Sequence, residues 1–249
     1  MKYIYGPVSS WRLGKSLGID LISGEKKCTF DCIYCQLGRG VSCTAKREIF
    51  ISTEDIVSEF EKLPATNVDY ITFSGSGEPT LAVNLGEVIT EIKKRTKTRV
   101  AVLTNSSLMG DEKVRGDLGK ADLVVAKMDA PNEKVFNEIN RPVKGIAFHD
   151  VLNGIKKFNS EYPGKMALQV MFIPQNKEYA SKEVDPAEVQ INTPLRPSGA
   201  RPIPSDELFR IKELFKPLKV HCAYDVQKDE VEPLSEGETR KRRPGFSGQ

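Results

Sequence analysis

The fold is decided by the stretch Lys27-Cys28-Thr29-Phe30-Asp31-Cys32-Ile33-Tyr34-Cys35. Its cysteines have the spacing C-x3-C-x2-C, so one loop can bring three thiolates to one metal centre. Such a loop can bind three corners of a cuboidal iron-sulfur cluster and leave the fourth iron open to an exogenous ligand. A closed zinc site with Cys43 as fourth thiolate is the alternative. Structural zinc sites usually combine two C-x2-C pairs, and the single pair here favours the cluster.

Length and composition indicate one catalytic domain in a reducing compartment. A chain of 249 residues with 39% hydrophobic residues can form one substantial core. Five cysteines, three of them clustered, favour the cytoplasm over a disulfide framework. No apolar run reaches the roughly 18 residues of a membrane span, and Gly6-Pro7 interrupts the N-terminus before a signal-peptide core could form. The net charge of +3 gives no general argument for nucleic-acid binding.

Apolar runs of strand length alternate with helical patterns, which predicts an α/β fold built from βαβ units with a parallel sheet. The predicted strands are 18–22, 70–73, 99–103, 123–126, 167–173 and 188–191. The predicted helices are 54–63 behind a Thr53 cap, 85–94, 112–119, 149–159 and 205–215. The polar link 176–185 gives no clear period, so its helix stays open.

The cysteine loop also resembles the signature of the radical S-adenosylmethionine (SAM) superfamily, with the aromatic Tyr34 just before the third cysteine. The flanking run from Tyr5 to Asp20 resembles, more narrowly, the wyosine-synthase-like group of prokaryotic iron-sulfur oxidoreductases. The resemblance extends from about Tyr5 to about Phe215. It implies a partial, open (β/α)6 parallel barrel. It also implies a 4Fe-4S cluster on Cys28, Cys32 and Cys35 that cleaves SAM reductively to a 5'-deoxyadenosyl radical, which abstracts hydrogen from substrate.

In parallel barrels, the side chains that do chemistry collect at the carboxyl ends of the strands. Gly75-Ser76-Gly77-Glu78-Pro79 follows the second predicted strand and resembles the Gly-Gly-Glu-Pro element that holds the SAM amino group, with Ser76 displacing the simplest pattern. Glycines allow a backbone to approach a ligand, and Glu78 could accept hydrogen bonds from an amine. A glycine turn with a solvated glutamate is the alternative.

Further candidates for SAM contacts follow the other strands. Asp129 could accept from the ribose hydroxyls and Lys127 could meet the SAM carboxylate, although either could be an ordinary surface charge. Tyr34 could present its backbone to adenine while its ring shields the cluster, or simply pack. The remaining polar candidates at strand ends are Asn105, Ser106 and Asn192, with turn or helix capping as the alternative.

The substrate is the least determined part of the prediction. tRNA wyosine synthases carry a second cluster that needs three further cysteines, and this chain has only Cys43 and Cys222 to spare. We expect Cys43 to be a spectator and Cys222 to be buried. The resemblance makes tRNA nucleoside modification the first expectation. Peptide, protein or small-metabolite radical chemistry, including glycyl-radical activation, and a non-catalytic electron carrier are the alternatives.

Expected partners are a ferredoxin or flavodoxin as electron donor and a tRNA or other macromolecular substrate, without a membrane. Candidates for a basic RNA-binding rim are Arg39, Lys46, Arg47, Arg196 and Arg201. The run Arg240-Lys241-Arg242-Arg243 could contact phosphates, although such runs are more often solvated ends. We expect one barrel domain over residues 1–225 and a charged, mobile tail over 226–249.

Overall fold

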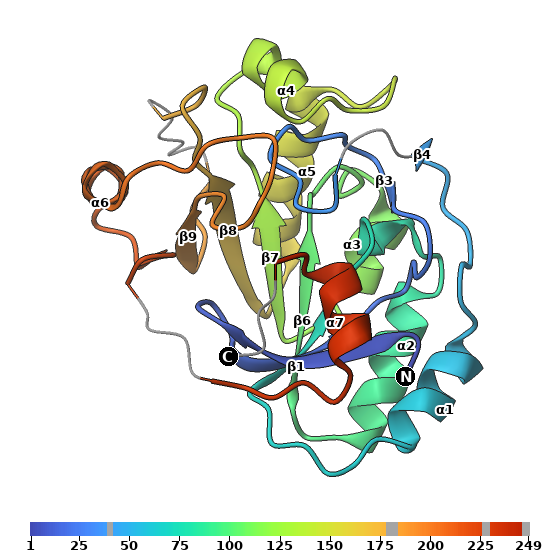
Figure 1. Ribbon diagram of the computed structural model, residues 1–249. Coiled ribbons are helices and arrows are strands. Elements are labelled where there is room, and N and C mark those ends of the chain that lie inside the picture. Colours follow the sequence, from blue (N-terminus) through green and yellow to red (C-terminus); the bar gives the residue numbers. More distant parts are fainter. Residues whose placement is uncertain (39–41, 178–183, 226–229, 246–249) are drawn as a thin grey trace.

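The computed structural model describes residues 1–38, 42–177, 184–225 and 230–245 (Figure 1). Its centre is an eight-stranded sheet. From one edge to the other, the strands are β1 (Ile4–Ser10), β2 (Gly14–Ile19), β5 (Tyr70–Phe73), β6 (Arg99–Thr104), β7 (Leu123–Lys127), β8 (Lys165–Met171), β9 (Glu188–Asn192) and β10 (Val220–Cys222). All pairs from β2 to β10 are parallel, and β1 pairs antiparallel with β2.

Helices connect the parallel strands and cover the outer face of the sheet (Figure 1). They are α1 (Thr53–Glu61), the 3-10 turn η1 (Pro79–Leu81), α2 (Leu85–Arg95), α3 (Glu112–Leu118), α4 (Glu133–Ile139), α5 (Phe148–Glu161) and α6 (Ser205–Glu213). The sheet and its helices form the partial, open barrel that the sequence predicted.

Alternate residues of the central strands pack on opposite faces, as the strand period requires. In β6, Val100 and Val102 join the main core formed with the helices. Ala101 packs instead with Val125 and Leu13 in a small cluster on the inner face. The inner face therefore holds few side chains of its own, and it leaves room for cavities near the strand ends.

All six predicted strands exist; the second has the predicted bounds 70–73, and the others have shifted ends. The largest shift is in the first, which runs Gly14–Ile19 and stops before Asp20. Asp20 ends the strand because its carboxylate accepts from the N–H of Ile22, two residues further on. All five predicted helices exist as well, although Ser52 rather than Thr53 caps α1. The strand β1 was not predicted, because Gly6-Pro7 suggested a break. Proline is tolerated there because β1 is an edge strand.

The prediction of a mobile tail over 226–249 is wrong for the helix α7 (Glu236–Arg242), which packs against β1. Thr239 accepts the N–H of Gly6 at 3.0 Å. Arg242 is 3% exposed, and its Nε donates to Asp20 Oδ2 at 2.8 Å. This segment therefore belongs to the barrel. Residues 226–229 and 246–249 lie outside the described part of the chain.

Candidate active site

The cysteine loop follows β2 and lies at the carboxyl ends of the strands, as predicted. The N–H of Ile33 donates to Ile139 O at 3.0 Å, which ties the loop to the end of α4. At its start, Lys27 N donates to Ser76 O at 3.2 Å, which ties it to the turn after β5. Residues 27–28 form the short strand β3 (Lys27–Cys28), which pairs with β4 (Ser42–Cys43). The loop is thus fixed by backbone hydrogen bonds to the end of α4 and to the turn after β5.

Amide donors point at two of the three cysteine sulfurs. Asn105 Nδ2 lies 3.5 Å from Cys28 Sγ, and Asn140 Nδ2 lies 3.5 Å from Cys32 Sγ. Burial raises the pKa of Cys28 to about 12, with the nearby Cys32 adding to the shift. Burial also raises the pKa of Cys32. Binding iron would release these thiol protons and turn both sulfurs into good acceptors for the two amides.

The structure places Cys43 beside the loop. Cys43 is the register partner of Cys28 across the β3–β4 pair. Within the described residues, no three His, Cys, Asp or Glu side chains are arranged to hold one metal ion. The spectator role of Cys43 stays a prediction, whereas Cys222 is buried as expected.

The turn after β5 requires its two glycines for different reasons. Gly75 has φ +156°, and an added Cβ would lie 2.3 Å from Asp20 Cγ. Gly77 forms a bridge with Lys27, and an added Cβ would lie 1.7 Å from Lys27 O. Between them, Ser76 donates from both N and Oγ to Asp20 Oδ2. The glycines therefore let the turn press against the start of the cysteine loop.

Glu78 lies in this turn, but its carboxylate serves the fold. It is 2% exposed, and burial raises its pKa. Oε1 accepts from Thr104 Oγ1 at 2.6 Å and from both the N and Oγ1 of Thr80. Oε2 accepts from Asn105 N at 2.7 Å. The burial of Glu78 contradicts the alternative of a solvated glutamate. Donors of the chain contact both oxygens, and a contact of Glu78 with the SAM amine stays a prediction.

Tyr34, Lys127 and Asp129 meet in one buried cluster with Asn140. The hydroxyl of Tyr34 donates a hydrogen bond to Asp129 Oδ2. Lys127 Nζ lies 2.9 Å from Tyr34 Oη and 2.9 Å from Asp129 Oδ2. Asn140 Nδ2 donates to Tyr34 Oη at 2.7 Å. Asp129 is 3% exposed, and its Oδ1 accepts from Met171 N at 2.7 Å. Asp129 thus orients Lys127 and Tyr34, and its contact with a ribose stays a prediction.

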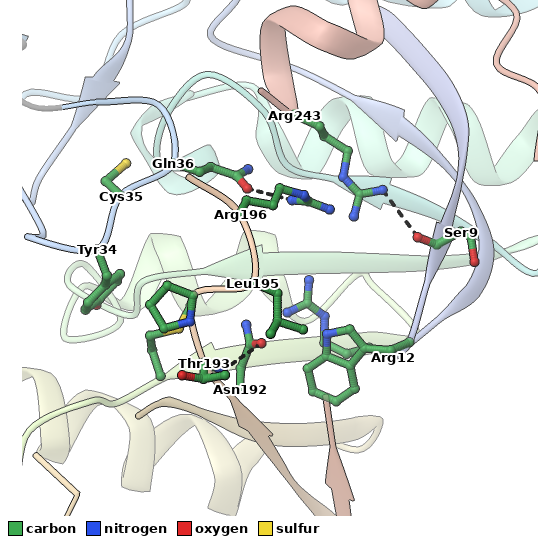
Figure 2. Close-up of a pocket in the computed structure, with 13 residues that line it drawn as sticks. Ser9, Arg12, Tyr34, Cys35, Gln36, Asn192, Thr193, Leu195, Arg196 and Arg243 are labelled. Carbon is green, nitrogen blue, oxygen red and sulfur yellow. Dashed lines mark hydrogen bonds between the residues drawn. The ribbon is translucent and has the colours of Figure 1, made fainter. Parts of the chain in front are cut away.

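A cavity of about 240 Å³ lies against this cluster (Figure 2). Tyr34, Cys35 and Met171 line one side, and Asn192 lies on another. Asn192 Oδ1 accepts from Thr193 N, so its amide nitrogen remains for a ligand. The cavity is therefore open to the third cysteine and bordered by polar groups, as a site for a small polar ligand requires.

The other predicted residues are placed as follows. Pro79 begins η1 and is buried. Asn105 bridges the Cys28 sulfur and Thr29 Oγ1. Ser106 has φ +69°, and its hydroxyl accepts from Lys127 N at 2.8 Å. Both polar residues therefore connect the ends of neighbouring strands and do not line the cavity.

Sequence reasoning missed three polar residues of the site. Asn140 follows α4, away from any strand end, and no signal pointed to it. Asn176 follows β8, so the strand-end rule could have found it; its Nδ2 donates to Asp129 O at 2.6 Å. Asp20 entered the prediction only as the last residue of the run from Tyr5 that resembles the wyosine-synthase-like group. In the structure its carboxylate accepts hydrogen bonds from Ser76 and Arg242.

Comparisons with known proteins agree with this geometry. The family described as the Radical SAM superfamily matches residues 25–184, which include the cysteine loop, the glycine turn and the Tyr34 cluster. The chain belongs to the radical SAM superfamily. Within the part of this radical SAM enzyme that the structure describes, no helix is both long and apolar enough to cross a membrane.

Relatives and solved structures extend the comparison. A UPF0026 protein of Synechocystis sp. is 44% identical over 201 residues, which cover 78% of this chain and 76% of the relative. A UPF0026 protein of Methanocaldococcus jannaschii is 39% identical over 214 residues, covering 81% and 66%. The structure of anSMEcpe with bound AdoMet has a TM-score of 0.62 and 19% identity, with 84% and 64% covered, and shows the same fold.

The cofactors of this radical SAM enzyme are a 4Fe-4S cluster and SAM. The described residues fit them. Three thiols on one loop suit a cluster with one open iron, and two amides already point at their sulfurs. The cavity bordering Cys35 offers space next to the third cysteine, and Tyr34, which also lines it, contacts the cation of Lys127. Like other members, the enzyme needs a reductant. The narrower wyosine-synthase-like grouping stays a prediction.

Proposed function

We propose that this enzyme cleaves SAM reductively and abstracts a hydrogen atom from a nucleoside of tRNA. When bound, the cluster and SAM supply the electron and the 5'-deoxyadenosyl radical. The observation that supports a catalytic role is the cavity that borders Cys35 at the carboxyl ends of the strands. An electron carrier has no need of such a cavity beside its cluster. The tRNA substrate is inferred from the resemblance to the wyosine-synthase-like group.

We assign the chain's residues the following roles. Cys28, Cys32 and Cys35 hold the cluster. Lys127, fixed by Asp129 and Tyr34, provides the positive charge for the SAM carboxylate. Gly75 to Gly77 offer backbone groups to the SAM amino group, and Glu78 fixes that backbone from behind. Asn192 offers its free amide nitrogen to the cavity.

The partners follow from the same chemistry. A ferredoxin or flavodoxin would supply the electron, and the cytoplasm is the compartment that we propose. All five cysteines are free, as a reducing compartment requires. These assignments share one requirement: the cluster must be reduced while SAM and substrate occupy the site.

Isotope transfer tests the tRNA assignment. The reconstituted enzyme is incubated anaerobically with dithionite, SAM and bulk tRNA prepared from cells grown in deuterated medium. The proposal predicts 5'-deoxyadenosine that is one mass unit heavier, because the abstracted atom stays on the product. Deuterated peptides and deuterated small-molecule extract serve as parallel samples. Mass transfer from either of these, with none from tRNA, would contradict the tRNA assignment and retain the radical chemistry.

A further inference from the structure

Three arginines from distant parts of the chain meet at the cavity (Figure 2). Arg12 lies in the turn between β1 and β2, Arg196 lies in the loop after β9, and Arg243 follows α7. We call these residues the arginine triad. The triad also borders a second cavity of about 130 Å³ on the inner face of the sheet. It therefore forms the wall between the two spaces.

The carboxylates of the described residues do not balance the charges of the triad. Among the residues that the structure describes, no carboxylate forms an ion pair with any of the three guanidinium groups. Arg196 donates to Gln36 Oε1 at 2.6 Å, and Arg243 donates to Ser9 O at 3.5 Å. Arg12 Nε is buried and has no hydrogen-bond partner in the described part of the chain. A buried guanidinium donor without an acceptor is costly, so the fold holds these groups in an unfavourable state.

Mutual proximity makes this state less favourable still. Burial lowers the pKa of Arg12 to about 9, with added repulsion from Arg243 and Arg196. Burial lowers the pKa of Arg196 to about 10, again with repulsion from Arg243. The neighbouring Arg242 behaves in the opposite way, since Asp20 and Glu238 raise its pKa against the effect of burial. Two adjacent arginines of one helix end thus have opposite environments: Arg242 is neutralised within the fold and Arg243 is not.

We propose that the arginine triad binds a phosphate group of the substrate. This inference rests on the proposed function and narrows its substrate to a phosphate-bearing one. A phosphate accepts several hydrogen bonds at once, and guanidinium groups match its oxygens in a forked geometry. The anion would give Arg12 Nε an acceptor and balance the repulsion within the triad. The triad and Cys35 line the same cavity, so a substrate held there by its phosphate would have another part near the cluster.

The phosphate could belong to a nucleotide or to an RNA backbone, which share this chemistry. The run Arg240-Lys241-Arg242-Arg243 was expected to be either a solvated end or a phosphate contact. Its residues differ in this respect. Arg240 and Lys241 form exposed ion pairs with Glu236 and Glu238. Only Arg243 of this run borders the larger cavity. Among the residues predicted to form a basic rim for RNA, Arg196 lines the larger cavity and Arg47 forms an ion pair with Asp117. Arg39 lies outside the described residues.

Binding to the reconstituted enzyme tests the proposal. Uridine monophosphate, uridine and a short single-stranded RNA are titrated anaerobically at fixed ionic strength by calorimetry. The wild-type protein should bind the monophosphate at least about tenfold more tightly than uridine, because charge-assisted hydrogen bonds contribute about 1.5–3 kcal/mol. Tighter binding of RNA than of the monophosphate would assign the phosphate to a backbone. Equal binding of uridine and its monophosphate would overturn the proposal even if no variant folded.

Variants then assign the effect to the triad. Arg196→Gln and Arg243→Gln should each weaken phosphate binding by about 10-fold or more. The matched control Arg240→Gln removes one positive charge from the same segment as Arg243. It should change the affinity for phosphate less than about twofold. SAM binding is measured on each preparation. Loss of SAM binding with unchanged phosphate binding would place the triad at SAM and overturn the proposal. Failure of SAM cleavage alone, with Arg-dependent phosphate binding intact, would instead count against the proposed function.

Discussion

The buried carboxylates and the arginine triad of this protein differ in whether the described chain supplies their hydrogen-bond and ion-pair partners. The carboxylates of Asp20, Glu78 and Asp129 each accept hydrogen bonds from donors of the chain. The arginines of the triad are only partly buried, and they have no carboxylate partner among the described residues; one atom, Arg12 Nε, is buried without an acceptor there. Charges that are paired internally hold strand ends together. Charges left unpaired beside a cavity are the ones available for a ligand.

The largest expected effect comes from breaking the Glu78 network. Glu78→Ala should lower the free energy of unfolding by about 4 kcal/mol, because four buried donors lose their acceptor at once. Urea denaturation of the purified variant measures this loss. The exposed Glu138→Ala is the control, with a change within about 0.5 kcal/mol. If the two variants were equally stable, Glu78 would have no structural role.

A somewhat smaller loss is expected from Arg242→Met. This change leaves Asp20 buried with its Arg242 hydrogen bond lost, which should cost about 3 kcal/mol. The control Arg240→Met removes an exposed ion pair of α7 and should cost at most about 0.5 kcal/mol. Thermal unfolding of both variants measures the difference. A stable Arg242→Met protein would support the prediction of a mobile tail over 226–249.

Lys127→Met tests the charge that Asp129 and Tyr34 hold beside the cavity. We expect SAM affinity to fall about tenfold, since one charge-assisted contact is lost. Equilibrium dialysis of the reconstituted protein measures the affinity. Lys134→Met, on the exposed side of α4, should bind SAM as the wild type does. Wild-type affinity in the Lys127 variant would remove this residue from the SAM site.

Arg12→Gln should separate ligand binding from stability. Removal of an unpaired buried charge should leave the free energy of unfolding unchanged or raise it by about 1 kcal/mol, while phosphate binding weakens. Urea denaturation with and without phosphate measures both effects. A loss of several kcal/mol without phosphate would mean that Arg12 is paired within the fold, and the comparison with the carboxylates would fail.

The smallest effect is a dependence on pH. A phosphate monoester gains its second charge near pH 6, so its affinity should rise a few-fold between pH 5 and 7. The pKa of Arg12 is lowered only to about 9, so the triad stays protonated throughout this range. Sulfate keeps two charges in the same range and serves as the control ligand. Parallel pH profiles for sulfate and the monoester would show that the ligand's charge does not matter.

The sequence predicted the parallel strands and the cysteine loop because both depend on local patterns. Alternating apolar runs mark strands, and the loop's cysteines are adjacent in the chain. It could not predict the partners of Glu78 and Asp129, because these come from separate strands and a helix end. It also placed Arg242 and Arg243 together in a solvated tail. Their separate roles depend on α7 docking against β1, which no local pattern signals.

The central claim is that Cys28, Cys32 and Cys35 hold a cluster that enables SAM cleavage. The most direct test is anaerobic iron-sulfide reconstitution, reduction with dithionite, addition of SAM and chromatography for 5'-deoxyadenosine, with Cys32→Ala alongside. The account predicts 5'-deoxyadenosine from the wild-type protein and none above background from the variant. Cluster assembly without SAM binding or cleavage in the wild type would contradict it and indicate an electron carrier, and binding of zinc alone would overturn the cluster itself.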